Sequence, residues 1–313
     1  MIVTVTPGSM VGHFLRLPSS CLPAAVSLDK AVTVATGKGT NVSRTVRDFG
    51  VPTLALGCIG GFTGRRFVKL LEDEGIPFHG VEADGETRTG IFIMAPDGTL
   101  IQEIADERFC AGPETEENLL ALVRTNLSGA RFAVCAGKLL PGFSDEFLPK
   151  LIRACQRAGV RCLIDARGPF LKRVLHDRPF MIKPNEQELS DFAGEPLPHD
   201  PGALAAYCRE RFDVCGRGPE HVLLSLGPRG VVLVTPGEAW HVGVGQAVAG
   251  NAIGCGDTLV GGVLSSLVEG YALVEAVRRG VAAATANLAS DVPGAVPHDL
   301  FRAYLERTRV TRL

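Results

Sequence analysis

Residues 251–258 (NAIGCGDT) have types and a spacing that suit phosphoryl transfer, because they place glycines and an acid at the start of a predicted helix. Glycines at a helix start let backbone N–H groups converge on an anion, which the helix dipole also favours. Asp257, in the first helical turn, would accept the proton of an attacking hydroxyl. An ordinary glycine turn before a helix has the same residues, so the motif alone leaves both interpretations open.

A second glycine-containing helix start, residues 37–41 (GKGTN), adds a cation and an amide to the same arrangement. Lys38, Gly39 and Asn41 provide donors that suit a sugar hydroxyl or a substrate phosphate. When the segment is taken alone, an ordinary glycine turn followed by a surface lysine explains it equally well.

Asn185 and Glu188 lie three residues apart in the segment KPNEQE (183–188), and they share one face if a helix begins there. Oxygen ligands of this type suit Mg²⁺ that is held through water. A helix cap and its neighbour have the same spacing, so this pair is also open to a purely structural interpretation.

Strands and helices alternate along most of the chain that must position these residues. Strands are predicted at residues 2–6, 53–59, 132–136, 161–165, 180–183, 221–225 and 231–235. Helices are predicted at residues 40–49, 63–74, 116–125, 145–158, 170–175, 201–212, 257–269, 273–289 and 298–307. This alternation predicts an α/β fold in which helices cover both faces of a mostly parallel sheet.

Two stretches, residues 11–36 and 87–104, are strand-like without intervening helices. The second is predicted to be a hairpin that turns at residues 96–98 (PDG). Both are too short to fold alone, so we expect a small β-sheet that projects from the main sheet. The chain shows no linker, and we predict one domain, 1–313, with this small sheet formed by about residues 9–36 and 87–106.

Composition excludes several classes of protein. The net charge is −2 and no run of Lys or Arg is present, which argues against a nucleic-acid partner. The first residues lack a basic segment and reach Pro7 early, so neither a signal peptide nor a membrane partner is expected. The nine cysteines are scattered and never spaced as C-x-x-C, which is against a disulfide scaffold or a zinc knuckle. We expect a reduced, soluble, cytoplasmic protein.

Taken together and in this order, these segments resemble the PfkB/ribokinase family of carbohydrate kinases over nearly the whole chain. The first signature of the family is matched by residues 37–41, 49–52 (FGVP) and 57–64 (GCIGGFTG), and the second by residues 251–261. Between them lie matches at residues 85–89 (GETRT), 112–113, 184–188 and 225–230. The GETR segment and Asn251 look most like the branch that contains 1-phosphofructokinase and tagatose-6-phosphate kinase.

The resemblance implies a ribokinase-like, three-layer α/β/α fold with a β-sheet lid, and ATP- and Mg²⁺-dependent transfer to a hydroxyl of a phosphorylated sugar. On the catalytic side it implies that Asp257 is the general base and that the amides of Gly254, Cys255 and Gly256 form an anion hole. On the nucleotide side it implies roles for Asn185 and Glu188 toward Mg²⁺ and ATP, with Glu188 acting through water, and for Ser225, Gly227 and Asn287.

On the substrate side, the resemblance implies that Gly39 and Asn41 bind sugar hydroxyls, while Lys38 and Arg88 favour an acceptor that already carries phosphate. The small sheet corresponds to the lid of the family, which closes over the sugar and excludes water. Because an exposed lid edge favours pairing, a homodimer through the lid is a further expectation.

One departure from the family pattern removes an acid. The phosphosugar branch usually begins its lid with N-P-A-x-D, whose Asp holds sugar hydroxyls, and the corresponding run here is TPGSM, residues 6–10. Met10 therefore stands where that Asp would be, and a thioether cannot accept two hydroxyl protons as a carboxylate does.

Two further departures add cations. Lys138 and Arg167 stand where serines are common in the family, and with Lys38 and Arg88 they would place four cations around one acceptor phosphate. Alternatively, Lys138 and Arg167 point to solvent or pair with acids such as Asp145 or Glu146.

Three functions remain open at this point. The first is a kinase of a phosphorylated sugar. The second is a kinase of an unphosphorylated sugar or small alcohol. The third is a catalytically silent protein that binds a sugar phosphate. Retention of Asp257 with the glycines beside it favours an active enzyme.

Overall fold

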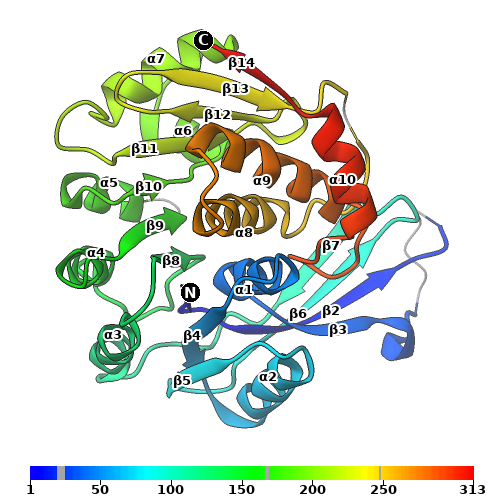
Figure 1. Ribbon diagram of the computed structural model, residues 1–313. Helices are drawn as coiled ribbons and strands as arrows, with labels where there is room; N and C mark the ends of the chain where they lie inside the picture. The colour runs from blue at the N-terminus through cyan, green and yellow to red at the C-terminus, as the bar shows by residue number, and fades with distance from the viewer. Residues whose placement is uncertain (20–24, 166–168, 247) are drawn as a thin grey trace.

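A ten-stranded sheet forms the centre of the computed structural model, which describes all residues except 20–24, 166–168 and 247 (Figure 1). Its order is β14-β13-β12-β11-β10-β9-β8-β1-β4-β5. The strands are β1 (Ile2–Thr6), β4 (Thr53–Ile59), β5 (Phe78–Glu82), β8 (Phe132–Ala136), β9 (Arg161–Asp165), β10 (Met181–Ile182), β11 (His221–Ser225), β12 (Val231–Val234), β13 (Ala239–Gly243) and β14 (Arg309–Arg312). From β5 to β11 neighbouring strands are parallel, and from β11 to β14 they are antiparallel.

The sheet is parallel at its centre because its inner strands are apolar on both faces. Every residue of β1 and β8 is buried, which is typical of strands covered by helices on both sides. The predicted mostly parallel α/β fold is confirmed.

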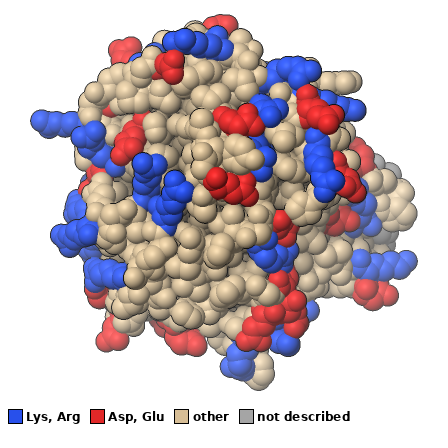
Figure 2. Space-filling view, in the orientation of Figure 1, with Lys and Arg blue, Asp and Glu red and all other residues tan. Residues whose placement is uncertain are grey.

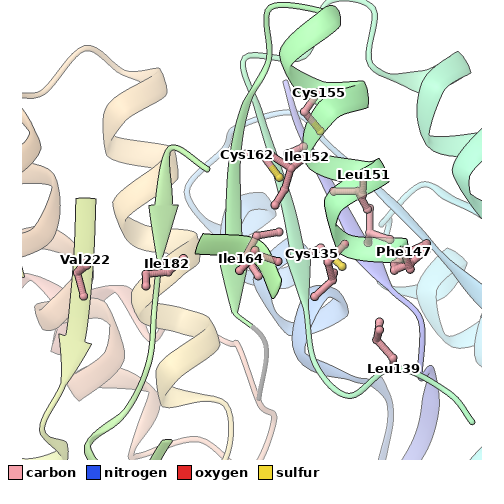
Figure 3. Packing of buried hydrophobic residues seen from close by; sticks show 14 of the residues in the cluster. Cys135, Leu139, Phe147, Leu151, Ile152, Cys155, Cys162, Ile164, Ile182 and Val222 are labelled. Carbon is pink, nitrogen blue, oxygen red and sulfur yellow. The ribbon is translucent and has the colours of Figure 1, made fainter. Parts of the chain in front are cut away.

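Helices cover both faces of the sheet (Figure 1). They are α1 (Lys38–Asp48), α2 (Gly61–Asp73), α3 (Thr115–Asn126), α4 (Phe147–Arg157), α5 (Pro169–Val174), α6 (Glu186–Ala193), α7 (Pro201–Arg211), α8 (Cys255–Val268), α9 (Leu273–Asn287) and α10 (His298–Arg307), with short 3-10 turns η1 (Leu28–Lys30), η2 (Leu175–Asp177) and η3 (Gly227–Arg229). One core packs α3, α4 and α7 against the sheet, and Figure 3 shows Phe147, Leu151 and Ile152 of α4 over Cys135 and Ile164. The other core packs α1, α8 and α9 against the opposite face.

The two strand-like stretches form the predicted separate sheet, which projects to one side of the domain (Figure 1). Its order is β3-β2-β6-β7, from β2 (Met10–Arg16), β3 (Val32–Thr36), β6 (Arg88–Met94) and β7 (Leu100–Ala105). The predicted hairpin turn is present, because Ala95 N donates to Thr99 O at 2.8 Å and Gly98 adopts a φ of +90°. We call this four-stranded sheet the lid.

Several sequence predictions of element bounds were wrong. Helices α1 and α8 begin two residues earlier than predicted, because Gly37 (φ +127°) and Gly254 (φ +84°) occupy the N-cap positions and let the following residues enter the helix. Strands β5 and β14 were missed because they are the polar edges of the sheet; all four residues of β14 are exposed. β13, which pairs with β14, was also missed.

Charged side chains of both signs are interspersed over the surface in Figure 2. Many of them are paired locally, as Arg278 is with Glu275 on α9 at 2.8 Å. Within the part of the chain that the structure describes, no helix is both long enough and apolar enough to cross a bilayer.

Candidate active site

The amino-terminal ends of α1 and α8 meet, and this contact brings Asn41 to Asp257. The two helices pack closely at Gly261, where a Cβ atom would lie 2.5 Å from Thr45 Cβ. Asn41 Nδ2 then donates to Asp257 Oδ2 at 2.8 Å, across 216 residues of sequence. The two glycine-rich segments predicted from the sequence therefore form one site.

Asp257 is a buried carboxylate with only 5% of its surface exposed. Burial raises its pKa to about 6, and the nearby Asp165 acts in the same direction, while Lys38, Lys183 and the Asn41 hydrogen bond oppose the shift. A carboxyl group with this pKa is ionised at neutral pH and binds a proton readily, as a general base requires.

Asn41 is held in one orientation by two donors. Its Oδ1 accepts from Thr36 Oγ1 at 2.9 Å and from Arg44 Nη1 at 3.2 Å. Since the amide oxygen is occupied in this way, the amide nitrogen faces Asp257.

Arg44 ties this arrangement to the rest of the domain, although it is 1% exposed. Its guanidinium binds Glu74 through two nitrogens at 2.5 and 2.7 Å, and it also donates to the carbonyls of Ala35 and Pro293 at 2.6 Å each. Sequence analysis missed this residue; the only local signal is its position three residues after Asn41 on the helix.

Asp165, at the end of β9, binds two lysines. Lys38 Nζ lies 2.9 Å from Asp165 Oδ1, and Lys183 Nζ lies 3.4 Å from Oδ2. Burial acts to raise the pKa of Asp165, but the two ammonium groups hold it below its ordinary value. Asp165 and Lys183 had no predicted role.

Lys183 faces the first turn of α8. A Cβ atom at Gly256 would lie 3.6 Å from Lys183 Nζ, so the ammonium group stands beside the glycine-rich helix start. Lys183 is 4% exposed, and its charge adds to the positive potential of the helix terminus.

The glycine-rich loop itself uses some of its groups internally. Gly254 packs against Pro293, where a Cβ atom would lie 2.7 Å from Pro293 Cβ. The Cys255 amide donates to Ala252 O at 3.3 Å. The Cys255 thiol points toward Asn287, and burial raises its pKa to about 12, so it is a neutral thiol.

On the nucleotide side, Asn185 and Glu188 form a helix capping box at the start of α6. Asn185 Oδ1 accepts from Glu188 N at 2.7 Å, and Glu188 Oε2 accepts from Asn185 N at 2.9 Å. Ser225 lies beside them, since its Oγ contacts Pro184 O at 3.4 Å, and Gly227 follows it with a φ of +57°. Burial acts to lower the pKa of Lys38, but Asp165, then Asp257 and, least of all, Glu188 raise it above its ordinary value.

Asn287 is fully buried and donates to the carbonyls of Val292 and Ala295 at 3.2 and 2.9 Å. It therefore shapes the loop after α9. In the described part of the chain, no group of three or more His, Cys, Asp or Glu side chains is arranged to hold a metal ion. The indirect contact of Glu188 with Mg²⁺ through water stays a prediction.

The cations predicted for the acceptor phosphate form two groups. Arg88 and Lys138 both bind Glu107, at 2.5 and 2.7 Å. Lys38 binds Asp165, and Arg167 lies outside the described residues. The gathering of four cations around one acceptor phosphate stays a prediction. Lys138 does pair with an acid, as the alternative interpretation expected, but that acid is Glu107, and Asp145 binds Arg173 instead.

The two groups nevertheless lie close together. A Cβ atom at Gly137 would lie 3.6 Å from Lys38 Cβ, and one at Gly8 would lie 3.7 Å from Arg88 Nη1 and 3.2 Å from Lys138 O. A Cβ atom at Gly39 would lie 2.5 Å from Thr6 Oγ1, so Gly39 packs closely against β1. Gly8 and Gly137 thus leave room for the lysine and arginine side chains to gather beside the start of α1.

Comparisons with known proteins agree on one family. A family profile described as pfkB family carbohydrate kinase matches residues 6–295. 1-phosphofructokinase of Bacillus subtilis (strain 168) is 28% identical over 317 residues, covering 100% of both chains. ATP-dependent 6-phosphofructokinase isozyme 2 of Escherichia coli (strain K12) is 31% identical over 281 residues, covering 87% of this chain and 88% of that one.

Solved structures agree with the sequence comparisons. Phosphofructokinase-2 from Escherichia coli in complex with substrates and products has a TM-score of 0.87 at 28% identity, covering 97% of this chain and 98% of that one. The tetrameric inhibited form of the same protein has a TM-score of 0.83 at 28% identity, covering 98% and 99%.

Proposed function

The chain belongs to the pfkB family of carbohydrate kinases, and we propose that it transfers the terminal phosphoryl group of ATP to a hydroxyl of a phosphorylated sugar. The observation that carries this proposal is the buried Asp257 carboxylate at a glycine-rich helix start, oriented by Asn41 and flanked by two lysines.

Asp257 acts as the general base. It takes the proton of the acceptor hydroxyl while that oxygen forms a bond to the terminal phosphorus, and the bond from phosphorus to the departing ADP oxygen breaks. The raised pKa of Asp257, about 6, suits this role at neutral pH.

Positive charge around Asp257 stabilises the phosphoryl group during transfer. The amides of Gly254 and Gly256 at the start of α8 serve as the anion hole, the Cys255 amide joins them when it releases Ala252 O, and Lys183 adds its ammonium group there. The cluster of Asp165 with Lys38 and Lys183 carries a net charge of +1, which compensates the charge of ionised Asp257.

The nucleotide lies on the α6 side in this proposal. Mg²⁺ bound with ATP would supply charge neutralisation of the phosphates. Glu188, through water, and Asn185 would hold it, and their carboxylate and amide oxygens fit such an ion. Ser225 and Gly227 contact the nucleotide, and Asn287 shapes the wall beside it.

The acceptor lies between the lid and α1. Arg88 and Lys138 bind its phosphate and exchange Glu107 for that ligand, and Lys38 adds a third positive charge. Gly39 and Asn41 face its hydroxyls. The lid hairpin touches the loop that leads to Gly254, since a Cβ atom at Gly98 would lie 2.8 Å from Asn251 N, and this contact helps to exclude water.

The test is ADP release with ATP and Mg²⁺ across a panel of sugars and sugar phosphates. We expect turnover with phosphorylated acceptors and a loss of about 10²–10⁴-fold in kcat for Asp257→Asn, the range for removal of a general base. Absence of ADP release by the wild-type protein with every compound of the panel contradicts the proposal. Turnover confined to unphosphorylated sugars supports the second function considered from the sequence.

A folding control accompanies this variant. The pKa of Asp257 is raised in the folded state, so its ionised form costs folding free energy above pH 6, and Asp257→Asn removes that cost. The variant is therefore expected to melt no lower than wild type at pH 8. Asp73→Asn, at a carboxylate that is 59% exposed, is the matched control and should keep full activity.

The homodimer through the lid stays a prediction. Val32 on β3, and Leu100 and Ile104 on β7, are exposed apolar residues on the two edge strands of the lid, which supports pairing there. The cytoplasmic location and the division of the chain into one domain with a lid also stay predictions.

A further inference from the structure

The face of the lid that turns toward Asp257 is apolar at the position between the two polar ends of the acceptor site. Met10 pairs with Thr36 on one side and with Arg88 on the other, so these three side chains share one face. Thr36 bonds to Asn41 and hence connects to Asp257. Met10 therefore occupies the middle of a row that runs from the phosphate-binding arginine to the network of the base.

The next residues along the strands extend this apolar surface. The rings of Phe14 and Phe92 stack with centroids 4.5 Å apart and planes 5° from parallel. They lean back over Gly12 and Gly90: Cβ atoms there would lie 2.7 Å from the Phe14 ring and 3.0 Å from the Phe92 ring.

Met10 lies over the same two strands, because a Cβ atom at Gly90 would also lie 2.6 Å from Met10 Sδ. We call Met10, Phe14 and Phe92 the apolar floor. Ile253, the residue before Gly254, and Val292, in the loop after α9, pack against it. The floor therefore faces the segment that carries the catalytic residues.

Hydrogen-bonding groups at both ends of the row are already engaged. Thr36 Oγ1 donates to Asn41, and Arg88 donates to Asp106 O and Glu107. The thioether of Met10 is at most a weak acceptor. A hydroxyl pressed against the apolar floor would lose its water without gaining a protein partner, and this costs binding free energy.

Resting on the proposed function, we propose that the acceptor is a deoxy sugar phosphate, whose lid-facing carbons carry hydrogen instead of hydroxyl, and that Met10 sets this specificity. The acceptor would present its phosphate to Arg88, its reacting hydroxyl to Asp257, and a deoxygenated face to Met10, which the buried Phe14 and Phe92 support from behind. Met10 is then a specificity-determining residue that touches the substrate.

The test compares kcat/KM for ketohexose 1- and 6-phosphates with that for analogues in which single hydroxyls between the phosphate and the reacting alcohol are replaced by hydrogen. We expect at least one deoxy analogue to be preferred by about 10–10²-fold, the discrimination an apolar site gives against an added hydroxyl. Met10→Gln has nearly the same shape but adds donors and an acceptor, so it should shrink that preference at least tenfold. Met10→Leu keeps the site apolar and should preserve the preference.

Each outcome has a distinct meaning. Equal or better kcat/KM for the fully hydroxylated phosphates with the wild-type protein overturns the inference and leaves the proposed function standing. If Met10→Gln prefers the deoxy analogue over the hydroxylated phosphate as strongly as wild type does, Met10 is not the cause of that preference. Absence of phosphoryl transfer to any phosphorylated acceptor, with or without the hydroxyls, overturns the proposed function together with this inference. The comparison of substrates in the wild type does not depend on whether the variants fold.

Discussion

Two polar clusters serve the acceptor side of the site, and they differ in how they are held. The cluster at Asp257 is buried: Asn41 and Arg44 are 4% and 1% exposed, and each makes several hydrogen bonds. The cluster at Glu107 is on the surface, where Glu107 and Lys138 are 53% and 63% exposed. The first fixes positions, and the second provides charge whose partners can exchange.

The difference matters because the same type of contact has different consequences in the two places. Removal of one partner from a buried charged network leaves the others without solvent or a replacement. An exposed pair is screened by water and salt, and its loss changes little. Substitutions in the buried cluster should therefore change both stability and chemistry, while those in the surface cluster should change substrate affinity alone.

The largest effect is expected for Arg44→Met. This change leaves the carbonyls of Ala35 and Pro293 without their donor and Glu74 without its main partner, so the free energy of unfolding should fall by about 3 kcal/mol. Asn41 also loses one of the donors that orient it, and its hydrogen bond to Asp257 weakens. Because that bond lowers the pKa of Asp257, the acid limb of the kcat/KM profile, near pH 6 in wild type, should move to higher pH.

A neighbouring arginine provides the control. Arg47 also reaches Glu74, with the carbonyl at 2.8 Å and the carboxylate at 3.4 Å, but it makes its closest ion pair with Asp48 and is 34% exposed. Arg47→Met should lower stability less and leave the acid limb where it is. If the acid limb of the kcat/KM profile does not shift in Arg44→Met, measured under conditions where that variant is folded, then Arg44 supports the fold without positioning the base.

The contrast between the clusters also explains what the sequence revealed. Glycine, cation and acid at a helix start are local signals, so Asp257, Lys38 and Asn41 were predicted, and the structure brings them together. The partners that hold them were not predicted, because they are distant in sequence: 30 residues separate Arg44 from Glu74, and 127 separate Lys38 from Asp165.

The strands also divide into those that a local sequence pattern predicts and those that it does not. Alternating apolar segments predicted the inner strands, and β4, β8, β9 and β11 have the predicted bounds because each is a continuous apolar run between turns. The edge strand β14 is polar, and β5 has only two apolar side chains, Phe78 and Val81, in an irregular pattern, so no apolar run marks either strand. Pairing with a neighbour, which sequence periodicity does not report, makes them strands.

A smaller effect is expected at the less exposed member of the surface cluster. Arg88 is 13% exposed, and Arg88→Ala should raise KM for a phosphorylated acceptor by about 10²-fold with kcat little changed, since a charge-assisted hydrogen bond is lost. The KM of Arg88→Lys should lie between those of wild type and Arg88→Ala, because a lysine keeps the charge but cannot bind in the same forked geometry.

Arg108→Ala is the matched control for this measurement, because Arg108 is 91% exposed and binds Asp106 beside the same segment. It should leave KM unchanged. A fall in kcat rather than a rise in KM for Arg88→Ala would place Arg88 with the buried cluster and contradict the distinction between the two.

The smallest effect is expected for Lys138→Ala. Lys138 binds Glu107 and is largely exposed, so water replaces its ammonium group at little cost. Without Lys138, however, Glu107 interacts with Arg88 alone and competes more strongly with the acceptor phosphate. The expected rise in KM is about threefold at low salt and vanishes as salt screens the charges. Adding Glu107→Gln should cancel it, since no carboxylate then competes with the acceptor phosphate for Arg88. A rise above tenfold that persists in the Glu107→Gln background would show that Lys138 binds the phosphate as firmly as Arg88 does.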